Sequence, residues 1–239
     1  VSCERVFRPD WETRPMGILS NNDGCIIARS NELKAAGIPM AAPYFQIRDQ
    51  LNAMRAVVLS SNYALYGEMS ARVMAVLSRF TPHIEVYSID EAWLELTGLT
   101  AQHMDYGRHI VDTTRRHTGI PVSMGIGSTK VLAKLANYIC KQHQIQSHVY
   151  DLTQIQNINP ILRAIPVSKV WGIGHRWAEK LKPFGIYTAL DLKNADPTHI
   201  KKSFSVVMQR IVLELRGMSC LDFEEESAKK SITSSRSFG

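Results

Sequence analysis

The sequence contains no apolar run close to the roughly 18 residues that a membrane-spanning helix requires, so we expect no membrane span in it. Cysteine is also scarce. The four cysteines, Cys3, Cys25, Cys140 and Cys220, are scattered and form no C-x-x-C pair. This spacing argues against a structural zinc site and against a disulfide framework. Reduced thiols in a cytoplasmic protein are the simplest interpretation.

The sequence does contain enough apolar residues for a substantial core, together with an excess of positive charge. Hydrophobic residues make up 45% of the 239 residues, which suits one large domain or a few small ones. Lysine and arginine number 28 against 22 aspartate and glutamate, a formal net charge of +6 that favours a polyanionic partner. The chain starts on Val1 inside a predicted helix and stops on Gly239 without a polar tail, so we expect a piece of a longer protein.

Two adjacent acidic residues, Asp90 and Glu91, lie between two alternating apolar stretches within residues 84–96. That pattern predicts a β-hairpin with the acids at or near its turn. Neighbouring side chains on a regular strand point to opposite faces, so both acids can serve one site only where the chain bends. A bent acidic pair supplies the hard oxygen ligands that divalent metal ions prefer. For an isolated pair of acids, a solvated turn is the simpler interpretation. The choice between a solvated turn and a metal-binding pair therefore depends on the other motifs of the chain.

Turn residues and apolar periodicity divide the rest of the chain into helices and strands. We expect strands at 16–20, 25–28, 56–60 and 121–127, and helices at 1–8, 31–36, 43–53, 62–79 and 102–117. This order indicates an α/β (α+β) fold in which helices cover a mixed sheet. Strand signals fade after about residue 150. We therefore expect a second, all-helical domain at 151–222, followed by a linker at 223–239.

The helix expected after Gly127 carries a row of cations. Ser128 is its predicted N-cap, and Lys130, Lys134 and Lys141 share one face at helical spacing. The row is either an ordinary solvated face or a set of triphosphate contacts beside the acidic hairpin. Lys141, near the end of the helix, is the lysine that we expect to reach a triphosphate.

Residues 171–185 have the pattern of a helix-hairpin-helix. Gly172, Ile173 and Gly174 place two glycines around one apolar residue, and a basic helix with Arg176 and Lys180 follows. The glycines let the backbone approach a ligand, and the N–H groups at the start of the helix then face a phosphate oxygen. Such a hairpin would bind the DNA backbone without sequence preference. The alternative is a tight helical connector that binds nothing.

A third polar segment, residues 21–34, joins a glycine-containing turn to a short helix. Arg29 and Lys34 are candidates for contact with the phosphates of a nucleotide, and Asn31 lies between them. A capped surface helix explains this segment equally well when it is considered alone.

Seven short stretches, taken together and in this order, are similar to those of one enzyme family. They are residues 2–4, 19–25, 60–63, 87–92, 129–137, 170–174 and 235–239. The chain resembles the Y-family DNA polymerases, and in particular the UmuC subgroup, the catalytic subunits of bacterial polymerase V and of its plasmid-borne relatives. The resemblance extends from one end of the sequence to the other.

This resemblance implies a right-handed polymerase fold without its last domain. Residues 1–6 and 63–148 would form the palm, and residues 7–62 the small fingers inserted into it. Residues 149–222 would form a helical thumb that contains the helix-hairpin-helix. Residues 223–239 would link the thumb to a little-finger domain, which is absent from the sequence and would follow Gly239.

The resemblance also implies roles for the candidate residues. Asp90 and Glu91 match the catalytic acids that bind metal, and Lys141 matches a lysine that contacts the incoming triphosphate. Lys34 and Asn31 stand where many relatives have an arginine and a tyrosine. A lysine ammonium, which acts as a point charge, therefore replaces a guanidinium that can bind a phosphate through two hydrogen bonds. A two-ion Mg²⁺ site would need a further aspartate, expected before Val1 together with the aromatic residue that discriminates the sugar.

Such a protein would be an error-prone translesion DNA polymerase, which joins dNTPs to a primer-template past damaged DNA in an SOS-type response. By the same resemblance we expect a UmuD-like dimer, a recombinase filament and a sliding clamp as partners, and a bacterial, nucleoid-associated location in the cytoplasm. Without the further aspartate, we expect impaired activity of this fragment. The alternatives are a non-catalytic DNA-binding or regulatory relative, and a helix-hairpin-helix nuclease or glycosylase, which leaves Asp90 and Glu91 unexplained.

Overall fold

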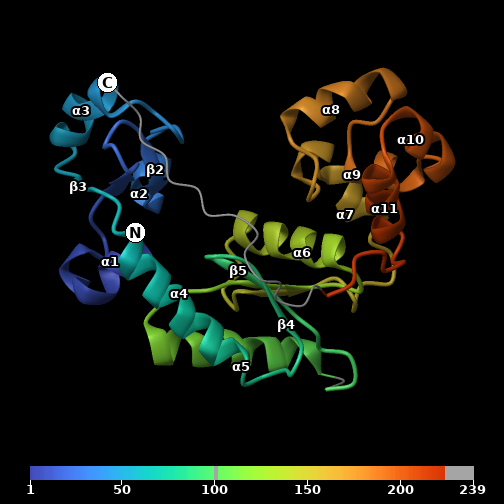
Figure 1. The fold of residues 1–239 in the computed structure, drawn as a ribbon, viewed down its shortest axis with the longest axis horizontal. Coiled ribbons are helices and arrows are strands. Elements are labelled where there is room, and N and C mark those ends of the chain that lie inside the picture. The colour runs from blue at the N-terminus through green and yellow to red at the C-terminus, as the bar shows by residue number, and fades with distance from the viewer. Residues whose placement is uncertain (100–101, 224–239) are drawn as a thin grey trace.

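The computed structural model describes residues 1–99 and 102–223, which form two lobes above a common base (Figure 1). Residues 1–59 build most of one lobe, residues 159–215 build the other, and residues 63–151 build the base. The predicted α/β class with a helical last part is confirmed. None of the described helices is long and apolar enough to cross a membrane. The predicted linker, residues 223–239, lies outside the described residues except for Phe223.

The first lobe is built on a three-stranded sheet in which β1 is the central strand. The buried β1 (Met16–Leu19) pairs antiparallel with β2 (Ile26–Arg29) and parallel with β3 (Val57–Leu59). Helices α2 (Asn31–Ala35) and α3 (Tyr44–Ala53) belong to the same lobe. Its apolar core consists of Leu19, Ile26, Leu33, Ile38 and Leu51.

Helix α1 (Ser2–Phe7) connects this lobe to the base. The helix ends just before Pro9, as predicted, because the residue that precedes a proline is pushed out of the helical region. On its other side, the hydroxyl of Tyr66 in α4 (Tyr63–Leu77) donates a hydrogen bond of 2.9 Å to the Glu4 carboxylate.

The base contains two separate two-stranded sheets. Strand β4 (Ile84–Ser88) pairs antiparallel with β5 (Glu91–Leu94), and β6 (Met124–Ile126) pairs parallel with β7 (Val149–Asp151). The described strands therefore divide among three small sheets, whereas we expected the strand at 16–20, the hairpin and the strand at 121–127 to share one. Because β1 is hydrogen-bonded along both edges, it has no free edge for the hairpin.

Helix α5 (His103–Thr118) packs on β6 and β7 from one side, and α6 (Lys130–Gln142) packs on them from the other. Glycine permits the close approach of α6. A Cβ atom on Gly125 would lie only 2.1 Å from the backbone nitrogen of Asn137. The predicted strand at 121–127 is confirmed in a shorter form, with a glycine at its centre.

Two details of this region were predicted incorrectly. The N-cap of α6 is Thr129 and not Ser128, since the Thr129 Oγ1 atom accepts a hydrogen bond from the Leu132 N–H at 3.3 Å. Strand β7 lies at the start of a region that we expected to be helical throughout. A run of three residues carries no readable periodicity, and Val149 becomes part of a strand only because β6 provides the hydrogen-bonding edge.

The second lobe is helical, as predicted. Its α-helices are α7 (Asn159–Ala164), α8 (His175–Leu181), α9 (Ala189–Asn194), α10 (Pro197–Ser203) and α11 (Val206–Leu215). Three short 3-10 helices complete the described set: η1 (Pro9–Trp11) in the first lobe, η2 (Val167–Lys169) and η3 (Lys182–Phe184) in the second. One hydrophobic cluster contains residues of α6 and residues of this lobe, so the base and the second lobe share a core.

The joint between base and second lobe depends on Glu214 of α11, whose side chain is fully buried. Its Oε2 atom accepts a hydrogen bond from the Val131 N–H at 3.2 Å, in the first turn of α6. Its Oε1 atom accepts from the N–H groups of Cys220 at 2.6 Å and Leu221 at 3.2 Å. The Thr129 hydroxyl donates to the Glu214 carbonyl at 2.9 Å. One carboxylate therefore satisfies N–H groups of α6 and of the segment that leaves α11.

Replacement of Glu214 by alanine should lower the free energy of unfolding by about 3 kcal/mol, because three N–H groups lose their acceptor away from water. Urea denaturation measures this change. The exposed Glu179→Ala, which removes a surface ion pair with Lys182, serves as the control and should leave the midpoint unchanged. An unchanged midpoint in Glu214→Ala would show that the joint does not depend on this carboxylate.

The pKa of the Tyr66 hydroxyl tests the contact between α4 and Glu4 of α1. Burial, and the hydrogen bond to Glu4, raise the pKa of Tyr66 to about 12. A raised pKa in the folded state means that this group stabilises the fold below its unfolded pKa near 10, and that the contribution is lost as the pH rises from about 10 through 12. In a phenolate absorbance titration one tyrosine should ionise late, and Tyr66→Phe should remove that late phase only.

Candidate active site

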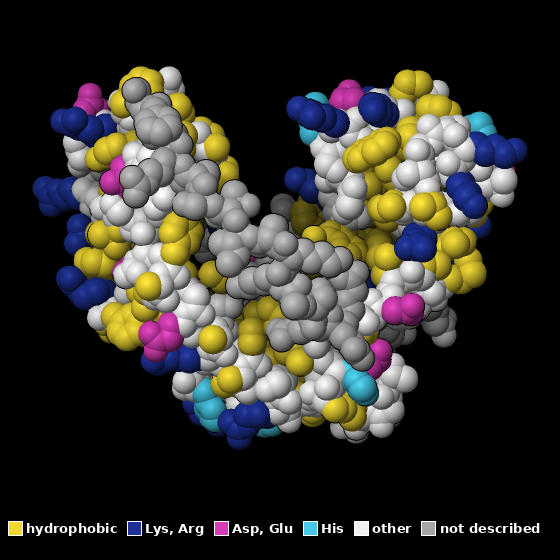
Figure 2. All heavy atoms as spheres, in the orientation of Figure 1, with side chains coloured by type: hydrophobic (Ala, Val, Ile, Leu, Met, Phe, Trp, Pro, Cys, Tyr) yellow, Lys and Arg dark blue, Asp and Glu magenta, His cyan; other side chains and the backbone are white. Residues whose placement is uncertain are grey.

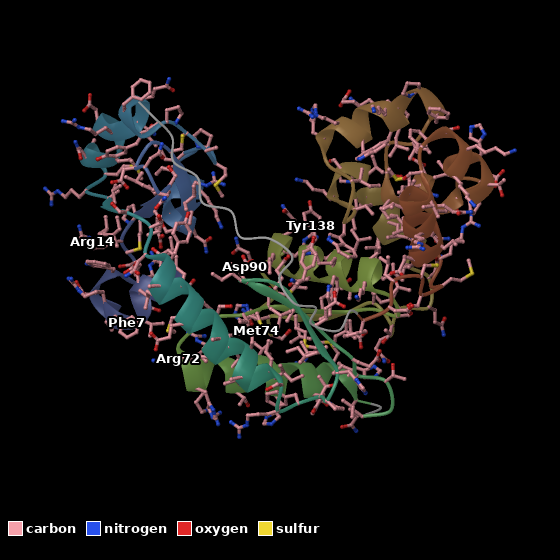
Figure 3. The ribbon with its side chains drawn as sticks, viewed as in Figure 1. Phe7, Arg14, Arg72, Met74, Asp90 and Tyr138 are labelled. Atoms are coloured by element: carbon pink, nitrogen blue, oxygen red, sulfur yellow. The ribbon has the colours of Figure 1, made fainter. Side chains whose placement is uncertain are left out.

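The two adjacent acids lie at the bend of the β4–β5 hairpin, as predicted. Ile89 and Asp90 form the turn, Ser88 pairs with Glu91, and the register slips between Val86 and Ser88. The Asp90 Oδ1 atom accepts a hydrogen bond from the Ser88 hydroxyl at 2.8 Å. Space-filling shows a wide opening between the lobes, and Asp90 lies in that opening above the base (Figures 2 and 3).

One face of the hairpin is turned toward α6. Every second residue of a strand points to the same face, so Glu85 and Tyr87 of β4 share a face. Glu91 and Trp93 of β5 lie on that face too, because Trp93 pairs directly with Glu85. The Lys130 Nζ atom lies 2.5 Å from Glu85 Oε2.

A second ion pair lies nearer the turn, where the Lys134 Nζ atom is 2.5 Å from Glu91 Oε1. The same nitrogen lies 5.7 Å from the centre of the Tyr87 ring. The Lys130 side chain is 8% exposed and that of Lys134 is 23% exposed, so water screens the first pair less than the second. Two lysines of α6 thus neutralise two of the hairpin's carboxylates.

The cation row is therefore present beside the acidic hairpin, and its members differ in the contacts that they make. Lys130 and Lys134 are bound to hairpin carboxylates. Lys141, seven residues beyond Lys134 and about 10 Å further along the helix, is exposed and makes no ion pair among the described residues. The lysine in contact with the acidic pair is thus Lys134. Sequence spacing did not identify it, since its partner is 43 residues away along the chain.

The donor atoms at the hairpin turn suit a hard divalent cation. Asp90 and Glu91 supply carboxylate oxygens, the ligand type that Mg²⁺ prefers. Among residues 1–99 and 102–223, no group of three or more histidine, cysteine, aspartate or glutamate side chains lies close enough to bind one ion. The two acids are therefore chemically suitable metal ligands, and within the described residues they are not joined by a third side chain of these types.

In the first lobe, the structure separates the three predicted phosphate contacts. The guanidinium of Arg29 donates to the carbonyl of Ile38, which ties β2 to the chain after α2. Lys34 and Asn31 lie together on the exposed face of α2, with the Lys34 Nζ atom 3.4 Å from Asn31 Oδ1. Of the two cations, Lys34 is exposed to solvent, whereas Arg29 is partly buried and hydrogen-bonded to the backbone.

In the second lobe, the two glycines of the hairpin motif have different roles. Gly172 has φ +85°, and a Cβ atom there would meet Ile211 at 2.9 Å. Gly174 has open space around it, so its backbone is accessible. Ile173 is 3% exposed and belongs to the core. Arg176 and Lys180 of α8 are exposed beyond this loop, as expected for cations that meet a DNA backbone.

Sequence reasoning missed an aromatic contact between this lobe and the hairpin. The ring of Trp171 lies 5.3 Å from that of Trp93 and 5.5 Å from that of Tyr87. The Trp171 Nε1–H donates to the Tyr87 hydroxyl at 3.4 Å. A tryptophan just before the first glycine of the motif was visible in the sequence, but its partners lie 78 and 84 residues away along the chain.

Models of known families match two parts of the chain. A model described as the impB/mucB/samB family matches residues 1–138. A model described as the IMS family HHH motif matches residues 156–186, which include both glycines of the hairpin motif. The first match alone covers more than half of the chain.

Alignments with two related proteins cover the whole chain. Protein UmuC of Salmonella typhimurium is 48% identical over 243 residues, and protein MucB of Escherichia coli is 44% identical over 242 residues. Both alignments include 100% of this chain and 58% of the relative, so the chain spans somewhat more than half the length of these proteins. DNA polymerase IV of Corynebacterium diphtheriae is 29% identical over 228 residues, covering 90% of this chain and 48% of that protein.

Solved structures share the fold. An insertion ternary complex of Dbh DNA polymerase matches with a TM-score of 0.74 at 21% identity, over 89% of this chain and 62% of that one. A Y-family DNA polymerase chimera of Dbh and Dpo4 matches with a TM-score of 0.77 at 21% identity, over 95% of this chain and 67% of that one. Because the model of the impB/mucB/samB family matches residues 1–138, the chain belongs to that family, in agreement with the UmuC-type resemblance of its motifs.

Proposed function

We propose that the chain is the fingers, palm and thumb part of an error-prone translesion DNA polymerase, which adds dNTPs to a primer-template past damaged bases. The observation that supports this most is the placement of Asp90 and Glu91 at a hairpin turn, in an opening flanked by a helix-hairpin-helix lobe. Relatives named UmuC and DNA polymerase IV support the same function. Since the chain spans 58% of UmuC, the activity is proposed for the longer protein.

Within this proposal the lobes are polymerase domains. Residues 7–62 are the fingers, residues 1–6 and 63–148 the palm, and residues 149–222 the thumb. The pairing of β7 with β6 favours a thumb that begins after residue 151, because β7 completes a sheet of the base. The gap between fingers and thumb would hold the primer-template.

Asp90 and Glu91 would hold Mg²⁺ together with a further carboxylate outside these residues. Bound Mg²⁺ would lower the pKa of the primer 3′ hydroxyl and stabilise the leaving pyrophosphate. The ion pair with Lys134 would keep the Glu91 carboxylate in place next to the turn before substrate binds. Ser88, through its hydrogen bond to Asp90, limits the rotation of the second carboxylate.

Two exposed lysines, one on α6 and one on α2, would bind the triphosphate. Lys141 lies beyond the paired lysines of α6, and Lys34 projects from α2 of the fingers with Asn31 beside it. Each would offset phosphate charge as a single cation. Arg29 would join them only after releasing the carbonyl of Ile38.

The thumb loop at Gly172, Ile173 and Gly174 would bind duplex backbone, with Arg176 and Lys180 contributing charge. A UmuD-like dimer, a recombinase filament and a sliding clamp are further proposed partners, on the family resemblance alone. A cytoplasmic, nucleoid-associated location in a bacterium is proposed on the same basis.

A non-catalytic DNA-binding relative is the second candidate. It is favoured by the finding that, among residues 1–99 and 102–223, no three histidine, cysteine, aspartate or glutamate side chains lie close enough to hold one metal ion. Primer extension by the full-length protein discriminates between the candidates, since only a polymerase lengthens the primer. Strand or base cleavage in the same assay would favour the helix-hairpin-helix nuclease or glycosylase instead.

Asp90→Asn and Glu91→Gln, made in the full-length protein, should each lower Mg²⁺-dependent primer extension by about 1,000-fold, because each removes a charge that holds the ions. The rate of single-nucleotide addition measures this loss. Asp112→Asn, an exposed carboxylate on α5, is the matched control and should extend at the wild-type rate. Wild-type rates in Asp90→Asn would contradict the assignment.

Arg176→Ala and Lys180→Ala should each weaken duplex binding by a similar factor on every sequence, and should reduce the slope of log affinity against log salt by about 1. Fluorescence anisotropy with two unrelated duplexes at several salt concentrations measures both effects. Arg72→Ala is the control, since Arg72 projects from α4 of the base and pairs with Glu68 (Figure 3). A loss confined to one of the two duplexes would contradict backbone binding.

A further inference from the structure

The β4–β5 hairpin has no third strand among the described residues. A two-stranded hairpin is marginal on its own and needs support from packing. At its base, the Thr81 hydroxyl donates to the Glu95 carbonyl at 2.8 Å. Toward its turn the hairpin is supported by side-chain contacts with the two α6 lysines and with Trp171 of the thumb.

Trp171 is firmly held by the thumb. Val170, just before it, is 2% exposed, and Ile173, two residues after it, is 3% exposed. Both belong to the cluster that forms the thumb core. Gly172, between them, is backed by Ile211 of α11. The backbone on both sides of Trp171 therefore moves with the thumb, while its ring contacts the palm.

The ring of Trp171 meets the hairpin next to the acids. Tyr87 and Trp93, its two partners, lie on the face that also carries Glu91. The contact with Tyr87 is edge-to-face, with an interplanar angle of 83°, and the contact with Trp93 is tilted by 60°. Aromatic pairs at these separations are directional, so a displacement of Trp171 changes the position that the hairpin prefers.

This contact is not needed to hold the thumb on the palm. Leu132, Leu135 and Ile139 of α6 already share a buried cluster with the thumb, and Glu214 adds hydrogen bonds across the same joint. Tyr87, by contrast, is 49% exposed at the edge of the opening. What Trp171 adds is a link from the thumb loop to the hairpin itself.

We propose that Trp171 is a positioning residue, which couples the binding of duplex DNA by the thumb to the placement of Asp90 and Glu91 in the palm. The loop that would grip the DNA backbone starts at Gly172, the residue next to Trp171 in the chain. A duplex that restrains this loop also restrains the Trp171 ring, and through Tyr87 and Trp93 it restrains the hairpin. This inference rests on the proposed binding of duplex by the thumb.

Hydrogen exchange of the amides in residues 84–94, with and without saturating duplex, tests the coupling in the chain as it stands. In the wild type, duplex should slow exchange of these amides about tenfold, within the usual range of coupling between sites. Trp171→Leu should still bind duplex, but its hairpin amides should respond less than about twofold. Trp171→Phe keeps an aromatic ring at the contact and should restore most of the response.

Phe184→Leu is the matched control, since it removes a thumb ring that packs on His199 and Phe204 and not on the hairpin. It should respond to duplex as the wild type does. A full response in Trp171→Leu, or none in a wild type that binds duplex, would overturn the coupling and leave the proposed thumb function intact. A wild type that fails to bind duplex at any salt concentration would overturn both.

Discussion

A buried carboxylate needs hydrogen-bond donors to be tolerated, and those of Glu214 come from both sides of the joint between base and second lobe. Val131 donates from the first turn of α6, and Cys220 and Leu221 donate from the segment after α11. The carboxylate thereby sets the start of α6 against the end of the second lobe. The shared hydrophobic cluster contributes non-directional stability to this joint, and the directional hydrogen bonds define its geometry.

The placement of the acidic pair follows from the placement of α6. The hairpin is a small sheet by itself, so Lys130 and Lys134 of α6 orient it through ion pairs with Glu85 and Glu91. These pairs neutralise carboxylates that would otherwise repel one another and any approaching anion. In the proposed polymerase, the same helix thus connects three things: the thumb joint, the catalytic hairpin and, at Lys141, an exposed cation for the substrate.

Local patterns were sufficient for most of the fold. Proline and glycine marked the ends of helices, and the alternation within 84–96 identified the hairpin and its turn. The errors occurred where pairing decides the structure. Strand β7 has three residues and exists because β6 offers an edge, and the N-cap moved from Ser128 to Thr129, where a hydroxyl also meets the Glu214 carbonyl. Neither partner is visible from the neighbouring sequence.

The sequence by itself determined which residues are candidates for the chemistry, namely adjacent acids at a bend and two glycines before a basic helix, and it contained motifs that identify the family. Only the tertiary structure decided which side chains meet. It paired Lys134 with Glu91, left Lys141 exposed, engaged Arg29 with a backbone carbonyl and set Trp171 against the hairpin. Residue type and spacing reflect local backbone geometry, whereas contacts between a side chain and a group outside its own helix or strand depend on how the helices and sheets pack.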